Sequence, residues 1–222
     1  MGMERSVLCV VAYMQKYLDK TIEESVMNIN SEFTIVDLEQ GSHKWHEWRR
    51  NGIGATNAKV TIGDRGKTFE RLLRIKAGLE EESGYQNSAM ALGVELEPEA
   101  RTKYIARTGT MVKPVCVQST NHEWLRASLD GIAEDHSGVV EIKCGARVYE
   151  IVDESGSIPD YYYAQTQHIL AVTGLRSLDF WCHWPENPDL LVNVPRNDAY
   201  IKNLLEKEEE FWNLVLSLRK TR

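Results

Sequence analysis

The sequence lacks the patterns that indicate a membrane span, a disulfide framework or a zinc site. Its four cysteines (Cys9, Cys116, Cys144 and Cys182) are far apart, and no Cys-x-x-Cys pair occurs. Scattered cysteines are typical of a reduced protein, so we expect neither disulfides nor a zinc or iron–sulfur cluster. No apolar run approaches the ~18 residues of a membrane span. The apolar residues 7–14 lack the basic flank and cleavage site of a signal peptide.

Positive charge is also in short supply. The formal net charge is −7, which argues against a generally basic nucleic-acid coat. It leaves room for an acidic site beside a local basic channel. With 222 residues, 42% of them hydrophobic, the chain can form one domain with a sizeable core. The pattern of apolar residues favours a mixed α/β domain, with a helical extension over residues 1–31 and a C-terminal helix over residues 198–222.

The most informative stretch is residues 124–144, where two short apolar runs flank a polar loop. This pattern predicts a β-hairpin. A four-residue loop at 134–137 would set Asp130 opposite Glu141. Because side chains alternate along a strand, Glu141 and Lys143 point to one face while Ile142 points to the other. Asp130, Glu141 and Lys143 should then share a face, provided that no bulge forms at Asp130-Gly131.

Two carboxylates and an ammonium on one strand face are costly to bury without compensation. Mg²⁺ would compensate them, since it prefers a few carboxylate oxygens together with waters and phosphate. Asp130 and Glu141 would be ligands, with the Ile142 carbonyl within reach of the same ion. Lys143 would orient or help deprotonate a metal-bound water, or neutralise charge in the transition state. This is chemistry for phosphodiester hydrolysis. The plainer interpretation is a surface hairpin with an ordinary cross-strand ion pair.

The surrounding residues resemble a known family. Ser128-Leu129-Asp130-Gly131 followed by Glu141-Ile142-Lys143-Cys144 resembles the core of the PD-(D/E)xK nucleases, and most closely the phage lambda exonuclease and YqaJ-type viral recombinase family. Three further stretches match this family in order: Trp45-His46-Glu47-Trp48-Arg49 with Gly54-Ala55-Thr56, then Gly93-Val94-Glu95-Leu96-Glu97, then Tyr162-Tyr163-Ala164-Gln165-Thr166-Gln167. Together they span about residues 42–180 of a chain that we expect to be a single nuclease domain over 1–222.

The resemblance implies a restriction-endonuclease-like core, in which a mixed central β-sheet is flanked by helices. It implies a Mg²⁺-dependent 5′→3′ exonuclease that degrades one strand of linear double-stranded DNA to mononucleotides. Two ions would occupy each active site, and Mn²⁺ could substitute. By the same resemblance, Asp130 bridges the metals, Glu141 binds one of them and Glu97 completes a ligand sphere. Lys143 serves the attacking water, and Gln165 hydrogen-bonds a phosphate or a metal-bound water.

A second group of residues is expected to hold the substrate. The resemblance maps Arg49 and Thr56 to positions that bind the terminal 5′-phosphate, adds Ser128 and Arg65 to the same pocket, and lets Tyr162 line the site. The physics agrees for the first two, because a guanidinium fork and a hydroxyl near a helix start form an anion site. Taken alone, Arg49 is equally well explained as a solvated charge. The loop that carries Arg65 lacks the P-loop pattern, so no NTPase is expected.

The resemblance also implies partners and a location. These are double-stranded DNA ends, a homotrimeric ring around the DNA, and a phage single-strand annealing protein that receives the 3′ single strand. The setting would be the cytoplasm of a bacterial host, for a phage- or prophage-encoded protein with no membrane contact. Two other functions stay open: a structure-selective or nicking DNA endonuclease of the same fold, and a catalytically inactive DNA-binding module. Closed circular DNA separates the first of these from an exonuclease, because an end-dependent enzyme leaves it uncut.

Overall fold

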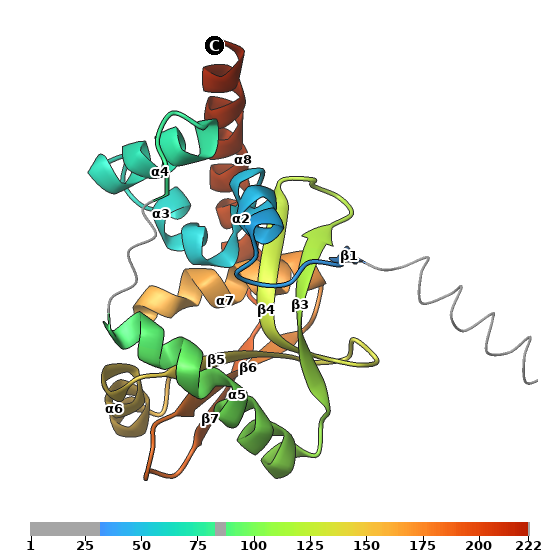
Figure 1. The fold of residues 1–222 in the computed structure, drawn as a ribbon, viewed down its shortest axis with the longest axis vertical. Coiled ribbons are helices and arrows are strands. Elements are labelled where there is room, and N and C mark those ends of the chain that lie inside the picture. Colours follow the sequence, from blue (N-terminus) through green and yellow to red (C-terminus); the bar gives the residue numbers. More distant parts are fainter. Residues whose placement is uncertain (1–31, 83–87, 222) are drawn as a thin grey trace, which may run out of the picture. The chain divides into compact units, whose positions relative to one another are not determined.

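The computed structural model describes residues 32–82 and 88–221, so the extension expected over residues 1–31 lies outside the described part. In that part, a seven-stranded sheet is flanked by helices (Figure 1). The strands are β1 (Phe33–Val36), β2 (Ile53–Gly54), β3 (Val112–Ser119), β4 (Leu125–Ala133), β5 (Val139–Cys144), β6 (Ser177–His183) and β7 (Leu190–Pro195). The helices are α2 (His43–Arg50), the 3₁₀ turn η1 (Ala55–Asn57), α3 (Ala58–Ile62), α4 (Lys67–Ala77), α5 (Ser88–Thr108), α6 (Ala146–Ser155), α7 (Asp160–Thr173) and α8 (Asp198–Lys220).

The strand order is β1-β3-β4-β5-β6-β7, with β2 paired to β4 outside this row. Strands β5 and β6 run parallel, as do β2 and β4, whereas the other pairs are antiparallel. A parallel pair needs a crossover connection, which α6 and α7 provide between β5 and β6. The sheet is therefore mixed and flanked by helices, as the sequence predicted.

Strand β4 has an alternation that explains its two faces. Its residues 125, 127 and 129 are buried, whereas residues 126, 128 and 130 are only partly buried. The buried set joins the main hydrophobic core with Ile169 and Leu170 of α7. Figure 1 shows α7 passing behind β4, while α5 crosses in front of the lower part of the sheet. The partly buried set is thus left free to line a site.

The hairpin of β4 and β5 has the register that the sequence predicted. Gly131 pairs with Val140, and the Ala133 N–H donates to the Gly138 carbonyl at 2.9 Å, as a loop at 134–137 requires. The two acidic positions of the sequence motif therefore lie on neighbouring strands.

A β-bulge forms at Asp130-Gly131. The prediction that Asp130, Glu141 and Lys143 share a strand face assumed that there would be no bulge here. The pairing of β3 with β4 shifts between Lys113 and Val115, so two steps along β3 span three steps along β4. The extra residue lies at Asp130-Gly131, opposite Pro114. Proline has no N–H to donate to a ladder, and inside sheets it is confined to edges and bulges. The bulge therefore ends the alternation after Asp130: residues 131–133 are all buried, whereas Asp130 stays on the partly buried side of β4 with residues 126 and 128.

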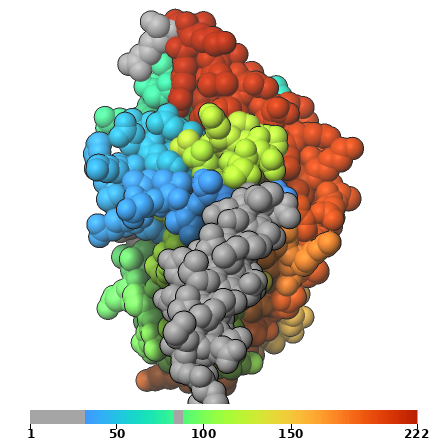
Figure 2. Space-filling model, turned by 90° about the vertical axis from the view of Figure 1, so that its right-hand side faces the viewer, coloured from blue at the N-terminus to red at the C-terminus, as the bar shows by residue number. Residues whose placement is uncertain are grey.

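Segments far apart in the sequence meet at the C-terminal helix. Figure 2 shows the connection between β3 and β4 (lime) at the surface. It lies between the N-terminal described residues (blue) and α8 (red). Arg219 of α8 donates to the Lys76 carbonyl at 2.6 Å and to the Arg50 carbonyl at 3.3 Å. Helix α8 therefore ties α4 to the end of α2.

Within residues 32–82 and 88–221, no helix combines the length and apolar character that a membrane crossing requires.

Candidate active site

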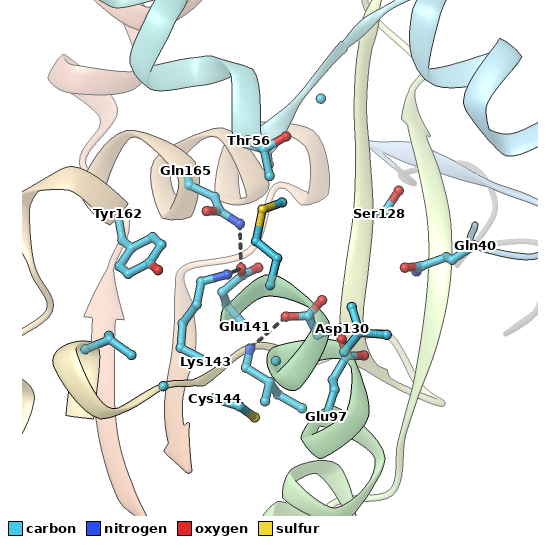
Figure 3. Close-up of a pocket in the computed structure, with 18 of the residues that line it drawn as sticks. Gln40, Thr56, Glu97, Ser128, Asp130, Glu141, Lys143, Cys144, Tyr162 and Gln165 are labelled. Carbon is cyan, nitrogen blue, oxygen red and sulfur yellow. Dashed lines mark hydrogen bonds and ion pairs between the residues drawn. The ribbon is translucent and has the colours of Figure 1, made fainter. Parts of the chain in front are cut away.

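A cleft of about 780 Å³ is lined by residues of α2, α5, α7 and of the β4–β5 hairpin. All the site residues predicted from the sequence, except Arg65, line this cleft. They are Arg49, Thr56, Glu97, Ser128, Asp130, Glu141, Ile142, Lys143, Tyr162 and Gln165. Figure 3 shows the acidic residues and Lys143 grouped at one part of the cleft, with Ser128 and Thr56 at a distance from them.

Glu141 contacts more than one of the other side chains in the acidic group of the cleft. It is 2% exposed, and its Oε1 accepts hydrogen bonds from Lys143 Nζ and Gln165 Nε2. The Lys143 ammonium also lies 4.9 Å from the ring centroid of Tyr162, close enough for a cation–π interaction. Tyr162 and Gln165 are three residues apart on α7 and so present one helix face to the strand. Helix α7 therefore fixes both Glu141 and Lys143.

Asp130 fills the point where β4 and β5 separate. Its Oδ2 accepts the Ile142 N–H at 2.8 Å, in place of the backbone carbonyl that a continued ladder would supply. Its backbone carbonyl accepts from Arg101 Nε at 2.7 Å, and the same guanidinium is ion-paired with Glu97. Sequence reasoning missed Arg101, although its i, i+4 spacing from Glu97 on α5 was a usable signal.

The electrostatics of this group are dominated by burial. Burial raises the pKa of Glu141 to about 7, with the Asp130 charge adding to the effect. Burial also raises the pKa of Asp130, and burial together with the Asp130 charge raises the pKa of Glu97. Burial alone would lower the pKa of Lys143, but the Glu141 and Asp130 carboxylates outweigh it and the pKa is raised. Two cations, Lys143 and Arg101, thus face three carboxylates, so the group carries surplus negative charge when all three are ionised.

The donor atoms of this group fit a hard divalent cation. Within the described residues, no three Asp, Glu, His or Cys side chains are gathered so as to hold a metal by themselves, and Glu97 is engaged by Arg101. Mg²⁺ needs fewer protein ligands, since it is usually held by one or two carboxylates together with waters and substrate phosphate. Asp130, Glu141 and the Ile142 carbonyl make up such a set. Burial raises the pKa of both carboxyl groups because it disfavours their charged forms, and a bound cation would offset that cost.

A second group of polar side chains comes from α2 and the turn that follows it. Arg49 donates from Nη2 to Thr56 Oγ1 at 3.0 Å, and its guanidinium lies 4.4 Å from the ring centroid of Trp45. Trp45 in turn donates from Nε1 to Ser128 Oγ at 2.8 Å. Three of the four residues predicted to bind a phosphate, Arg49, Thr56 and Ser128, are therefore linked through one indole ring. Ser42 caps α2 by accepting from the Trp45 N–H.

The structure does not bring Arg65 to this group. Its side chain is 65% exposed and ion-paired with Glu210 of α8 at 3.4 Å. A different guanidinium lines the cleft, that of Arg126, which lies 5.2 Å from the ring centroid of Trp48. Arg126 precedes Ser128 by two residues on β4, so the period of two along a strand could have found it. Arg65 was a poorer choice because its loop is placed by contacts with α8, which local sequence does not reveal.

Gln40 is a further cleft residue that sequence reasoning missed. Its Nε2 donates to the Leu129 carbonyl at 3.1 Å and to the Val115 carbonyl at 3.4 Å. Both carbonyls lie beside the bulge of β4, where the ladder is disrupted. Gln40 therefore stabilises the local backbone that carries Asp130, and nothing in its sequence neighbourhood signals this role.

Comparison with known proteins agrees with this geometry. Residues 44–176, well over half of the chain, match the family described as the YqaJ-like viral recombinase domain. The chain belongs to this family. The sequence resemblance is thereby confirmed for the family as a whole, and the matched segment contains both groups of cleft residues. No curated protein matches this YqaJ-like chain.

Solved structures agree with the fold. The YqaJ-like chain is similar to the crystal structure of an alkaline exonuclease, LHK-Exo, from Laribacter hongkongensis, with a TM-score of 0.72 and 23% identity over 81% of this chain and 95% of that one. LHK-Exo in complex with dAMP matches over the same shares with a TM-score of 0.72 and 24% identity. A phage related exonuclease from Haemophilus somnus 129PT has a TM-score of 0.57 and 12% identity, over 77% and 96%. These matches confirm the restriction-endonuclease-like fold class.

Proposed function

We propose that this YqaJ-like protein is a metal-dependent 5′→3′ exonuclease. It would degrade one strand of linear double-stranded DNA to mononucleotides and leave a 3′ single strand for annealing. The observation that carries the proposal is that one cleft holds two groups of residues. One is the acidic group with Lys143, and the other is Arg49, Thr56 and Ser128, which we call the anion-binding group. The structure of LHK-Exo in complex with dAMP adds support, because a deoxynucleoside monophosphate is the product such a reaction would release.

The contacts of the acidic group suggest a role for each residue. Bound by Asp130, Glu141 and the Ile142 carbonyl, Mg²⁺ would supply a nucleophilic water and Lewis-acid stabilisation of the phosphoryl group. Glu141 holds Lys143 beside the reacting phosphate, where its ammonium would neutralise developing negative charge. Gln165 orients Glu141 from the side of α7. Two ions in each site, Mn²⁺ as a substitute and Glu97 as a further ligand remain part of the proposal.

The anion-binding group supports an exonuclease in preference to an endonuclease. Arg49 and Thr56 offer a guanidinium and a hydroxyl that already contact each other, and Ser128 lies on the strand that also carries Asp130. A terminal 5′-phosphate bound here would direct the next phosphodiester bond toward the acidic group. Each cut would then regenerate the phosphorylated end that the pocket prefers, which favours repeated cutting along one strand.

Assembly and partners form the outer part of the proposal. By the family resemblance, three copies would form a ring around the DNA, and a phage single-strand annealing protein would take up the 3′ strand in the cytoplasm of a bacterial host. Light scattering on the purified protein tests the trimer, and co-purification with a recombinant annealing protein tests the partner.

The deciding experiment compares three substrates in the presence of Mg²⁺. These are linear duplex DNA with 5′-phosphorylated ends, the same duplex with 5′-hydroxyl ends, and a closed circle. The proposal expects rapid loss of the phosphorylated linear strand, slower loss of the hydroxyl-ended strand and an intact circle. Cutting of the circle would indicate an endonuclease instead. Binding of all three substrates without cutting, unchanged by Asp130→Asn, would indicate a DNA-binding module.

A further inference from the structure

The last turn of α2 is held by three cations from three different elements. Arg126 of β4 donates to the Trp48 carbonyl, Lys76 of α4 donates to the Arg49 carbonyl at 2.7 Å, and Arg219 of α8 donates to the Arg50 carbonyl at 3.3 Å. The final carbonyls of a helix have no partner within the helix, and cations are favoured there by the helix dipole. Side chains of α4, β4 and α8 therefore hold the main chain around Arg49, while the Arg49 side chain lines the cleft.

Lys76 is the buried member of this carbonyl clamp, which we define as Lys76, Arg126 and Arg219. It is 5% exposed, and burial lowers its pKa to about 7, with the nearby guanidinium groups adding to the effect. The charged and titratable groups that act on it come from every element around it: Arg49 of α2, Glu82 after α4, Arg126 of β4, His168 of α7 and Arg219 of α8. Among these, Glu82 is the one carboxylate.

Packing alone does not account for a lysine at this position. A buried cation among other cations costs free energy, and an apolar side chain of similar volume is often as stable or more stable at such a site. What the ammonium adds is a charged hydrogen bond to the backbone of Arg49 and positive potential behind the anion-binding group. Both effects are directed at the same cleft wall, where Arg49 meets Thr56 and Trp45.

We propose that Lys76 is a positioning residue that sets the preference of the cleft for a terminal phosphate. By fixing the Arg49 carbonyl, it orients the last turn of α2 so that the Arg49 guanidinium stays over Thr56. In its protonated form it also raises the attraction of that wall for a dianionic phosphate through a low-dielectric interior. The inference deepens the proposed function and rests on it, since it names a residue outside the cleft that governs end selection.

The test measures binding with catalysis switched off. Fluorescence anisotropy, with EDTA present, gives the dissociation constants of a short duplex with 5′-phosphate and with 5′-hydroxyl ends, and their ratio is the phosphate preference. Lys76→Met should lower this preference by about tenfold, the effect of losing one hydrogen bond that involves a charged group. Lys76→Arg should restore most of it. The control Lys207→Met, at an exposed lysine paired with Glu210, should keep the wild-type ratio.

The outcomes separate the inference from the proposed function. Arg49→Gln reports on the phosphate pocket itself. If wild type shows a preference that Arg49→Gln abolishes and Lys76→Met retains, the role of Lys76 is overturned and the pocket stands. If Lys76→Met weakens both ends equally, the residue is merely structural and the inference also fails. If wild type shows no preference and Arg49→Gln binds like wild type, the pocket is wrong, and the inference falls with it.

A second variant protects the test against a folding failure of Lys76→Met. Arg219→Gln removes another cation of the carbonyl clamp from its more exposed side, and should lower the phosphate preference in the same direction. Circular dichroism establishes that each variant is folded before binding is measured. An unchanged preference in folded Arg219→Gln, with Lys76→Met unfolded, would overturn the inference.

Discussion

Lys143 is the residue at which chemistry and binding should separate. Its ammonium contacts Glu141 and the Tyr162 ring, and it contributes no oxygen to a metal. We expect Lys143→Ala to lower the rate of hydrolysis by about 10²–10³, the usual loss for one stabilising donor in a transition state, while Mg²⁺ and DNA binding persist. Single-turnover digestion and calorimetric Mg²⁺ titration measure the two effects. Lys103→Ala, at an exposed lysine paired with Glu99, is the control, and an equal loss of Mg²⁺ binding would contradict the role.

Arg101 joins α5 to the strand of Asp130. Its guanidinium donates to the Asp130 carbonyl at 2.7 Å and pairs with Glu97. Arg101→Met should lower the melting temperature, measured in EDTA, by about 3–10 °C, because a hydrogen bond to a charged donor contributes roughly 1.5–3 kcal/mol. Hydrolysis should fall as well, since Glu97 and Asp130 lose their common support. Melting and activity like those of wild type would rule out this link.

At the scale of elements, the joint between α2 and β2 depends on close approach at Gly52. A Cβ at this residue would lie 2.5 Å from Arg126 Cδ and 2.7 Å from the Trp124 carbonyl oxygen. The backbone oxygen cannot yield as a flexible side chain can, so Gly52→Ala should destabilise the protein by about 1–3 kcal/mol in urea unfolding. Gly138→Ala is the matched control, because a Cβ there meets nothing within 4 Å. If both variants unfold at the same urea concentration, the close approach has no energetic consequence.

The contact between α4 and α2 should give stability a particular dependence on pH. The pKa of Lys76 is about 7 in the folded chain and about 10.5 when exposed. Between these values the unfolded chain binds more protons, so stability rises with pH. The cost of the buried charge is fully present below pH 7 and is removed as pH rises toward 10.5. Relative to Lys76→Met, wild type should therefore gain stability over this range in urea unfolding followed at several pH values. Parallel curves for the two proteins would exclude a low pKa at Lys76.

At the scale of the whole molecule, the proposed metal site should couple ion binding to global stability. The donor set exists only in the fold, because Asp130 and Glu141 are on different strands. A ligand at a hundred times its dissociation constant stabilises the folded state by about 2.7 kcal/mol, which corresponds to roughly 5–10 °C for a chain of this size. Saturating Mg²⁺ should produce this shift in calorimetry, and EDTA should reverse it. The Asp130→Asn, Glu141→Gln double variant should show no shift, and an undiminished shift would locate the ion elsewhere.

The hairpin, its register and the residues at its centre could be predicted from the amino-acid sequence. Strand alternation and a polar loop at 134–137 are local properties, so they could be read without a fold. Arg101 and Arg126 could also have been found from the sequence. Arg101 lies four residues after Glu97 on a helix, and Arg126 lies two residues before Ser128 on a strand. Four short stretches match the family and occur in the family's order along the chain. That order can be seen in the sequence, and it pointed to residues that line the cleft.

How these residues are brought together depends on contacts that only the folded chain makes. The bulge at Asp130 depends on pairing with Pro114 of another strand, and Gln40 supports it from a segment about ninety residues away in the chain. Arg65 was assigned to the cleft, yet its loop lies against α8. The carbonyl clamp under Arg49 likewise takes its cations from α4, β4 and α8. Each of these depends on contacts between residues distant in sequence, whose positions are set by the packing of the whole domain.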